Sequence, residues 1–344
     1  MDRRVSVSQF LLLAQQQVVL DVRSPGEYAH GHIPGAHSFP LFTDEERAAV
    51  GTCYKQVGPE EALELGLRIV GPKMADFVVE AKRLAPNKQA AIHCWRGGQR
   101  SGSMAWLLRQ AGFEVHTLEG GYKAYRTALL AYFPTLSLPL VVLGGRTGSG
   151  KTKILHELAQ LGEQIIDLEG IAHHKGSAFG FIGEAPQPSV EQFENHLFES
   201  IQALDLRRPI WIENESRSIG RVYLPDGLWA NMKSSRLVVI DIPQEARIAH
   251  LLEDYVHTNP EDLSLAFQKI SSKLGGLQLK IALEALQNND YAEAARIALR
   301  YYDKTYEHGL SNSPSNDIRY FSFEYGDPQQ IAAYLQEHHA GKSG

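Results

Sequence analysis

Apolar residues in this chain gather in short runs that alternate with longer stretches of helical period. The runs begin near residues 18, 90, 113, 140, 210 and 237, and segments with apolar residues three or four apart lie between them. Short continuous apolar runs are typical of strands buried on both faces, and their alternation with helices is typical of parallel sheets. The pattern predicts an α/β fold with parallel sheets.

Breaks in the pattern predict two domains. Residues 133–139, FPTLSLP, carry two prolines and are the predicted linker between a first domain, residues 1–132, and a second, residues 140–344. The second domain is predicted to be mostly helical from residue 244 onward. Residues 1–17 are predicted to form an amphipathic helix rather than a signal peptide, because they lack a small-residue cleavage site. Residues 43–80 mix helical periodicity with glycines, which suggests a helical insertion that covers or shapes a pocket.

Composition narrows the class of protein without identifying a function. A chain of 344 residues with 43% hydrophobic content is long enough for two globular domains. It contains no run of the roughly 18–20 apolar residues that a membrane span requires, so no membrane partner is expected. Two cysteines, Cys53 and Cys94, suit a reducing cytoplasm and support neither a disulfide scaffold nor a zinc site.

Charge gives no general attraction to nucleic acid, because the net charge is −6. RNA binding would need a local basic patch. Basic residues recur in the helical C-terminal part: Lys269, Lys273, Lys280, Arg296, Arg300 and Lys304. They form either a solvated helix face, which is the commoner arrangement, or a surface that contacts phosphodiesters.

The candidate nucleophile is Cys94, in the segment AIHCWRGGQRS at residues 91–101. An apolar run ends just before it, two glycines follow, and a helical pattern begins after Arg100. In such a strand–loop–helix segment, backbone N–H groups and the helix N-terminus form an anion-binding nest that lowers the pKa of a thiol. Arg96 and Arg100 add positive charge, so we expect Cys94 to be largely thiolate at neutral pH.

A phosphate-binding loop is predicted at residues 145–152, where GRTGSGKT fits G-x-x-x-x-G-K-[ST] after an apolar run and before a helical pattern. Gly145, Gly148 and Gly150 would let backbone N–H groups close around phosphates. Lys151 would reach a terminal phosphate, and the Thr152 hydroxyl would bind Mg²⁺.

Carboxylates that could accompany Mg²⁺ follow two other strands. Asp167 and Glu169 come at the end of the QII run, and Glu213 and Glu215 come at the end of the run at 210–212. Asp167 and Glu213 are the candidates that we select, and no other metal site is expected. The adjacent His173 and His174 face different ways in any regular structure, which argues against a metal pair.

The Cys94 loop by itself leaves two chemistries open. HCWRGGQRS fits H-C-x-x-G-x-x-R-S, the cradle of cysteine-dependent phosphatases, in which a thiolate attacks phosphorus and Arg holds the phosphoryl oxygens. The alternative is transfer of sulfur or selenium, with the nest stabilising a persulfide or selenide on Cys94. A general acid for the phosphatase reaction cannot be assigned from the sequence.

Residues 21–36, DVRSPGEYAHGHIPGA, resemble the opening of the rhodanese family, which follows D-V-R-x-x-x-E-Y-x-x-G-H-I-P-G-A. With the Cys94 loop, the resemblance covers roughly residues 5–130. It implies a small domain with a parallel sheet and the reactive cysteine at the carboxyl edge of that sheet. Asp21 and Arg23 would be structural residues near the pocket.

The whole chain resembles the bacterial tRNA 2-selenouridine synthase family, in which a rhodanese-like domain precedes a P-loop NTPase-like α/β domain with a helical C-terminal part. The segments that carry the resemblance are CWRGGQRS, GGRTGSGKT, DLEGIAHHKGSAFG and ENESRSIG, in this order. The resemblance implies a transferase acting on tRNA with 2-thiouridine at the wobble position. Geranyl diphosphate would convert the thio group to an S-geranyl group, and selenophosphate would then supply selenium.

Carried over to this chain, Cys94 is the matching rhodanese cysteine, expected to act through an S-selanyl intermediate. Selenophosphate, or an enzyme that makes it, is then an expected partner, and no tightly bound cofactor is expected. Because neither step obviously needs ATP hydrolysis, we expect the phosphate loop to bind geranyl diphosphate, with Phe179 and Phe181 as candidates to contact the apolar chain. The other hypotheses are a rhodanese-fold phosphatase or sulfurtransferase fused to a nucleotide-binding domain, a kinase regulated by a rhodanese module, and a non-catalytic sulfide-binding protein.

Overall fold

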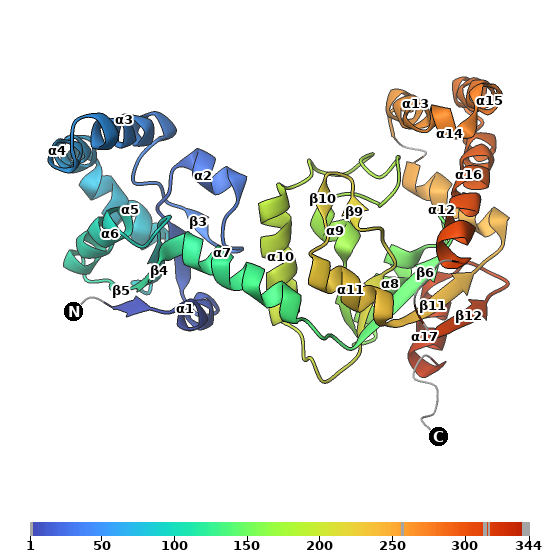
Figure 1. Cartoon of the computed structure of the whole chain (residues 1–344), viewed down its shortest axis with the longest axis horizontal. Coiled ribbons are helices and arrows are strands. Elements are labelled where there is room, and N and C mark those ends of the chain that lie inside the picture. The colour runs from blue at the N-terminus through green and yellow to red at the C-terminus, as the bar shows by residue number, and fades with distance from the viewer. Residues whose placement is uncertain (1–2, 256–257, 312–314, 316, 339–344) are drawn as a thin grey trace. The chain divides into compact units, whose positions relative to one another are not determined.

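The computed structural model describes residues 3–255, 258–311, 315 and 317–338 (Figure 1). The chain divides into two compact units, Met1–Tyr132 and Phe133–Gly344, and each has its own sheet. None of the helices in the described ranges is long and apolar enough to cross a membrane.

The first unit is built on a five-stranded parallel sheet with the strand order β1-β5-β4-β2-β3. The strands are β1 Arg4–Val5, β2 Val18–Asp21, β3 His37–Ser38, β4 Gln89–His93 and β5 Glu114–Leu118. Asp21 and His93 are register partners at the carboxyl ends of the two central strands. Cys94 therefore begins a loop at the carboxyl edge of the sheet, where parallel α/β folds place their ligands.

Seven helices surround this sheet: α1 Val7–Ala14, α2 Pro25–His30, α3 Asp44–Gln56, α4 Pro59–Val70, α5 Met74–Leu84, α6 Gln99–Gln110 and α7 Gly121–Tyr132. A short 3₁₀ turn, η1 Gly71–Lys73, joins α4 to α5. Capping boxes set the start of α2 at Ser24 with Glu27, and of α3 at Thr43 with Glu46. The predicted helical insertion is confirmed, because α3, α4 and α5 occupy residues 44–84.

The second unit is built on another five-stranded parallel sheet, with the order β12-β11-β6-β8-β7. The strands are β6 Leu140–Gly145, β7 Gln164–Ile166, β8 Ile210–Glu213, β11 Arg236–Asp241 and β12 Ile318–Ser322. A two-stranded antiparallel pair, β9 Ser218–Ile219 and β10 Val222–Tyr223, lies outside this sheet. The central strand β6 is buried over its whole length and leads directly into the phosphate loop.

The helices of the second unit are α8 Lys151–Gln160, α9 Leu168–Ala172, α10 Val190–Gln202, α11 Asp226–Ser234, α12 Gln244–Tyr255, α13 Pro260–Lys269, α14 Ser271–Leu274, α15 Gly276–Gln287, α16 Tyr291–Ser311 and α17 Pro328–His338. Figure 1 shows α13, α14, α15 and α16 gathered at one end of this unit. They form an apolar cluster with the segment after α9, in which Phe179, Phe267 and Ile297 are buried. The predicted α/β class and the helical C-terminal part are confirmed.

Four local features differ from the sequence expectations. Residues 4–5, within a stretch predicted to be helical, form the edge strand β1 and pair with β5. The C-terminal part, predicted to be mostly helical, contains an edge strand, β12, formed by the segment IRYFS and paired with β11. Glu169 lies inside α9 rather than at a strand end. Residues 133–139, predicted as a linker, begin with the 3₁₀ turn η2 Phe133–Thr135 and pack into the second unit, where the Leu138 N–H donates to Asn231 Oδ1 at 2.6 Å.

Candidate active sites

The thiol loop of the first unit is held from behind by the N-terminus of α7. The Tyr122 N–H donates to the Cys94 carbonyl oxygen at 2.8 Å, and the Lys123 N–H donates to that of Trp95 at 2.9 Å. This close approach requires glycine, because a Cβ on Gly121 would lie 2.4 Å from the same Cys94 oxygen, and its φ is +61°. The loop therefore has a fixed shape in which the Cys94 side chain is 3% exposed.

Several groups favour the thiolate form of Cys94. Burial alone would raise the pKa of this thiol. The Ser101 hydroxyl, 3.2 Å from Sγ, the backbone N–H groups of Ser101 and Arg96, and the charge of Arg100 outweigh burial and lower the pKa. Arg100 thus acts through its charge and Arg96 through its backbone, whereas the sequence suggested that both act through charge.

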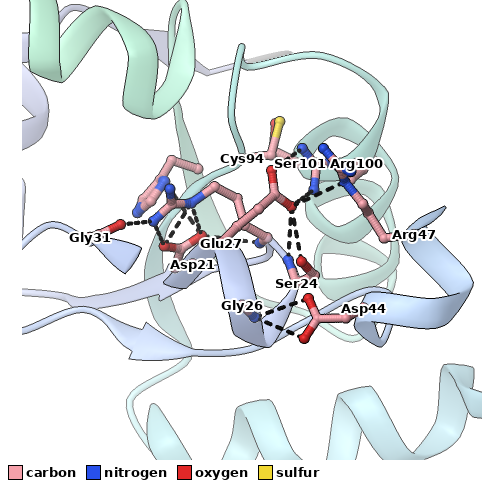
Figure 2. Close-up of polar contacts among 12 residues, drawn as sticks. Asp21, Ser24, Gly26, Glu27, Gly31, Asp44, Arg47, Cys94, Arg100 and Ser101 are labelled. Atoms are coloured by element: carbon pink, nitrogen blue, oxygen red, sulfur yellow. Dashed lines mark hydrogen bonds and ion pairs between the residues drawn. The ribbon is translucent and has the colours of Figure 1, made fainter. Parts of the chain in front are cut away.

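The guanidinium of Arg100 is oriented by Glu27, at the start of α2. Its two terminal nitrogens donate to the Glu27 carboxylate at 2.6 and 3.2 Å, and Arg47 of α3 approaches the same carboxylate at 3.8 Å (Figure 2). Burial would raise the pKa of Glu27, but the bonds and charge of Arg100 lower it. A two-point contact fixes the guanidinium plane, so Arg100 is held in one position beside the thiol loop.

Asp21 and Arg23 form a fully buried pair behind the loop. Arg23 donates from Nε to Asp21 Oδ1 at 2.9 Å and from its terminal nitrogen to the Gly31 carbonyl oxygen at 2.7 Å. The guanidinium carbon also lies 3.9 Å from the centre of the Tyr122 ring. These contacts join α2 to α7, which agrees with the structural role expected for both residues.

The phosphate loop connects β6 to α8 in the second unit, as its sequence predicts. Gly148 and Gly150 have φ values of +78° and +77°, which glycine adopts without strain. The Lys151 ammonium donates to the Gly145 carbonyl oxygen at 3.4 Å and so lies across the loop. Backbone N–H groups and the start of α8 make this loop a binding site for phosphate.

Helix α12 fixes the loop from one side. Arg247, 4% exposed, donates to the Thr147 carbonyl oxygen at 3.2 Å and forms a two-point ion pair with Asp303 of α16, at 2.7 and 2.8 Å. His250 Nδ1 lies 2.9 Å from the Gly148 carbonyl oxygen and donates to it. The loop and helix α16 are therefore connected through one buried arginine.

The carboxylate next to Thr152 is Glu169, which was not selected from the sequence. The Thr152 hydroxyl donates to Glu169 Oε2 at 2.5 Å. The two selected carboxylates have other partners: Asp167 caps α9 and pairs with His156 at 2.7 Å, and the fully buried Glu213 accepts from the Leu168 N–H at 2.9 Å. Burial, with the charges of Asp167 and Glu169 nearby, raises the pKa of Glu213 well above its usual range.

A second acid, Glu215, shares this end of the site. Burial and the charge of Glu169 raise the pKa of Glu215 to about 8, although Lys151 opposes the shift. The two carboxyl groups are also linked by a hydrogen bond. At neutral pH Glu215 keeps its proton and donates to Glu169, so this pair carries one negative charge rather than two.

The oxygen donors at this loop fit Mg²⁺, which Walker-type loops hold together with substrate phosphates. The Thr152 hydroxyl and the Glu169 carboxylate lie together, and Asp167 also lines the cavity around them. Within the described residues, no group of three or more His, Cys, Asp or Glu side chains could hold a metal ion by itself. Thr152 and Glu169 are therefore the residues that would hold Mg²⁺, with phosphate oxygens and water as the remaining ligands.

A cavity of about 700 Å³ opens from the phosphate loop and continues between the C-terminal helices. Polar residues line one end: Gly145, Gly148, Gly150, Lys151, Thr152, Glu169 and Glu215. Apolar residues line the other: Phe179, Leu263, Phe267, Leu286, Ala294, Ala298 and Leu299. The cavity can take a molecule with a charged head at the loop and a long apolar tail.

The two phenylalanines proposed for an apolar ligand behave differently. Phe179 lines the cavity and contacts the Phe267 ring at 5.0 Å between centroids. Phe181 is not among the lining residues, and its ring lies 3.8 Å from the Lys269 ammonium. Two of the basic residues considered for RNA binding form ion pairs within the unit: Lys280 pairs with Glu284 and Arg296 pairs with Glu245. These pairs favour a solvated helix face at both positions.

Sequence patterns did not single out Glu27 or Ser101 as functional residues, and they placed Glu169 and Glu215 near strand ends without selecting them as metal ligands. Each stood within a segment that was quoted for its motif, but its role depends on a neighbour at least seven positions away. The carboxyl ends of parallel strands meet at one edge of a sheet, so the carboxylates that follow β7 and β8 indicated an acidic group of side chains near the phosphate loop. That signal indicated the right region but not the right residues.

Fold and sites together define the class: a rhodanese-like domain joined to a P-loop domain of the AAA type. A family model described as rhodanese-like domain matches residues 8–128, and one described as tRNA 2-selenouridine synthase AAA domain matches residues 138–342. The chain belongs to the tRNA 2-selenouridine synthase family, which is a family of enzymes.

Curated relatives match almost the entire chain. The tRNA 2-selenouridine synthase of Nitrosomonas europaea is 38% identical, covering 92% of this chain and 94% of the relative. That of Sulfurovum sp. (strain NBC37-1) is 35% identical over 93% of this chain and 94% of the relative. A third, from Shewanella denitrificans, is 32% identical over 95% and 96%. The similarity therefore extends over both units.

Proposed function

We propose that this protein replaces the 2-thio sulfur of a wobble uridine in tRNA by selenium, in two steps with geranyl diphosphate and selenophosphate as co-substrates. In the first step, the thio sulfur attacks C1 of geranyl diphosphate, diphosphate leaves, and the uridine loses its N3 proton. In the second, the selenium of selenophosphate attacks C2, the C2–S bond breaks and geranylthiol leaves with a proton, and water then cleaves the Se–P bond and releases phosphate. The names of the relatives support the overall reaction, and the two sites support its division into steps.

The observation that carries the first step is the continuity of the phosphate loop with an apolar cavity. A nucleotide would place a polar sugar and a hydrogen-bonding base beyond its phosphates. The lining beyond Lys151 is mainly apolar and includes Phe179, Leu263, Phe267 and Ala298, although tyrosines such as Tyr302 also contribute to it. An isoprenoid tail buries apolar surface there at about 25 cal/mol per Å².

The chemistry of the loop suits a departing diphosphate. Negative charge develops on the bridging oxygen as the C1–O bond breaks, and Lys151, which lies across the loop, would stabilise that charge together with the loop N–H groups. Mg²⁺ held by Thr152 and Glu169 would supply further charge stabilisation. No ATP hydrolysis is needed for this step, although the loop has the sequence of a nucleotide-binding loop.

Cys94 is assigned to the second step. Its lowered pKa increases the fraction of thiolate, which is the nucleophilic form of the side chain. The same nest of N–H groups would bind the anionic oxygens of selenophosphate beside this thiolate. A phosphatase reaction is less favoured, because Arg100, which would have to hold the phosphoryl oxygens, is engaged by Glu27.

The experiment is incubation of the full chain with thiolated tRNA, geranyl diphosphate and selenophosphate, omitting each in turn, with nucleosides analysed by mass. The proposal predicts S-geranyl-2-thiouridine without selenophosphate and 2-selenouridine only with all three. Selenouridine formed at an undiminished rate without geranyl diphosphate would contradict the two-step scheme. Turnover of ATP independent of tRNA would instead favour the kinase hypothesis.

A further inference from the structure

The first unit contains a second cavity, of about 480 Å³, that the proposed reaction does not yet use. It lies between α3 and α4, the helical insertion, and the first two turns of α6. Its apolar walls are Leu41, Phe42, Val50, Tyr54, Ala62, Leu63, Leu67 and Val70. Helix α6 follows directly after the Cys94 loop, and Gln99, Arg100 and Ser103 of this helix also line the cavity.

The walls expose apolar surface that a folded protein normally buries. Leu63 is 48% exposed, Leu67 62% and Tyr54 60%, whereas Phe42 and Ala62 at the inner wall are buried. Single exposed apolar residues are common, but three lining one cavity of this volume are typical of a binding site for an apolar group.

The rim of the cavity is basic. Arg47, Lys55 and Arg100 all line it, and the one carboxylate that binds two of them is Glu27. Three cations against one anion leave net positive charge at the mouth. An apolar cavity with such a rim is complementary to an apolar group attached to a phosphodiester chain.

We propose that this cavity binds the S-geranyl group of the modified uridine and thereby presents its C2 atom to the Cys94 loop. The inference rests on the proposed function, since S-geranyl-2-thiouridine is the product of the first step. Arg100 lines the cavity and also lies in the surroundings of Cys94, where Figure 2 shows both residues. A geranyl chain bound here would therefore bring its uridine to the thiol loop.

This assignment explains the order of the two steps. A 2-thiouridine without the geranyl group has nothing to fill the cavity, so the selenium step acts mainly on the product of the first step. The geranyl group would then have two roles. It turns the sulfur into a leaving group, and it allows the first unit to recognise the product that the second unit makes.

The test uses the full chain with Leu67→Glu, since Leu67 is exposed and its replacement leaves the buried core intact. Short anticodon RNAs carrying either S-geranyl- or S-methyl-2-thiouridine are supplied with selenophosphate, and the rates of 2-selenouridine formation are compared. Val79→Glu is the matched control, because Val79 is 67% exposed in the same unit but does not line the cavity.

The wild-type chain and the Val79→Glu control are expected to act on the S-geranyl RNA at least about tenfold faster than on the S-methyl RNA. In Leu67→Glu this ratio should fall to near one, with the S-methyl rate unchanged. Retention of the wild-type ratio by Leu67→Glu, loss of the ratio in Val79→Glu, or no preference in the wild-type chain would each overturn the inference.

Geranylation of thiolated RNA is measured in the same samples. A chain that prefers S-geranyl RNA but forms none from geranyl diphosphate would support the cavity assignment and contradict the first step of the proposed function. The two proposals can therefore fail separately. If the cavity instead receives a protein, Leu67→Glu will leave the ratio unchanged and the inference fails.

Discussion

At the scale of single residues, both sites depend on charges held in place by neighbours from other elements. Cys94 becomes reactive through Ser101 and Arg100, and Arg100 is oriented by Glu27. At the phosphate loop, Glu215 keeps its proton, so the Glu169–Glu215 pair places one negative charge beside Lys151 instead of two. Each arrangement can be tested by removing one group.

Replacement of Ser101 by alanine should raise the pKa of Cys94, because the thiolate loses the hydrogen bond from the Ser101 hydroxyl. The pH dependence of alkylation, in a Cys53→Ser background, measures this pKa. Ser103→Ala, two positions further along α6, is the control. An unchanged profile in Ser101→Ala would show that this hydroxyl does not stabilise the thiolate.

Glu215→Gln should alter how diphosphate binding depends on pH. As the pH rises through about 8, wild-type Glu215 ionises beside Lys151 and Glu169, so affinity for inorganic diphosphate should fall, by roughly three- to tenfold. Glutamine remains neutral, and the variant should lose this part of the decline. Titration calorimetry at several pH values measures the affinity for diphosphate. An equal fall of this affinity with pH in both proteins would contradict the ionisation of Glu215 as its cause.

At the scale of elements, helix α16 forms one wall of the large cavity. Ala294, Ala298, Tyr302 and Tyr306 lie four residues apart on one face, and all four line the cavity. From Tyr306, beside the phosphate loop, to Ala298 the helix rises about 12 Å, which is close to the length of an extended geranyl chain. The small residue at 298 therefore leaves space where that chain would end.

A phenylalanine at position 298 should shorten the cavity. Ala298→Phe is expected to reduce transfer from geranyl diphosphate at least about tenfold while a five-carbon prenyl diphosphate is still accepted. Leu265→Phe, at a half-exposed position of α13 outside the lining, is the control. Equal loss with both donors would mean that the variant misfolds or that α16 does not face the tail.

The elements that the sequence predicted were those with local signals. Both active loops, and strands β2, β4, β6 and β8, follow from short apolar runs and glycine patterns within a few residues. Strand β12 was missed because its five residues stand among helices and its burial depends on pairing with β11. The apolar cavity was also beyond prediction, since Phe179, Phe267 and Ala298 come from segments about 30 to 120 positions apart.

At the scale of the whole molecule, two reaction sites of different chemistry are carried by two compact units. One site pairs a phosphate loop with an apolar cavity, and the other pairs an activated thiol with a smaller apolar cavity beside it. In the proposed reaction, the two cavities bind the same geranyl group, before and after its transfer. Geranylation and selenium transfer should therefore be separable by substitutions in one unit or the other.

The most direct test of the two-step reaction compares two variants, Lys151→Ala and Cys94→Ala. Each is incubated with thiolated tRNA, geranyl diphosphate and selenophosphate, and the nucleosides are identified by mass. Cys94→Ala should accumulate S-geranyl-2-thiouridine without selenouridine. Lys151→Ala should leave the 2-thiouridine largely unmodified, yet convert added S-geranyl tRNA to selenouridine at close to the wild-type rate. Full geranylation by Lys151→Ala, or normal selenouridine formation by Cys94→Ala, would contradict the account.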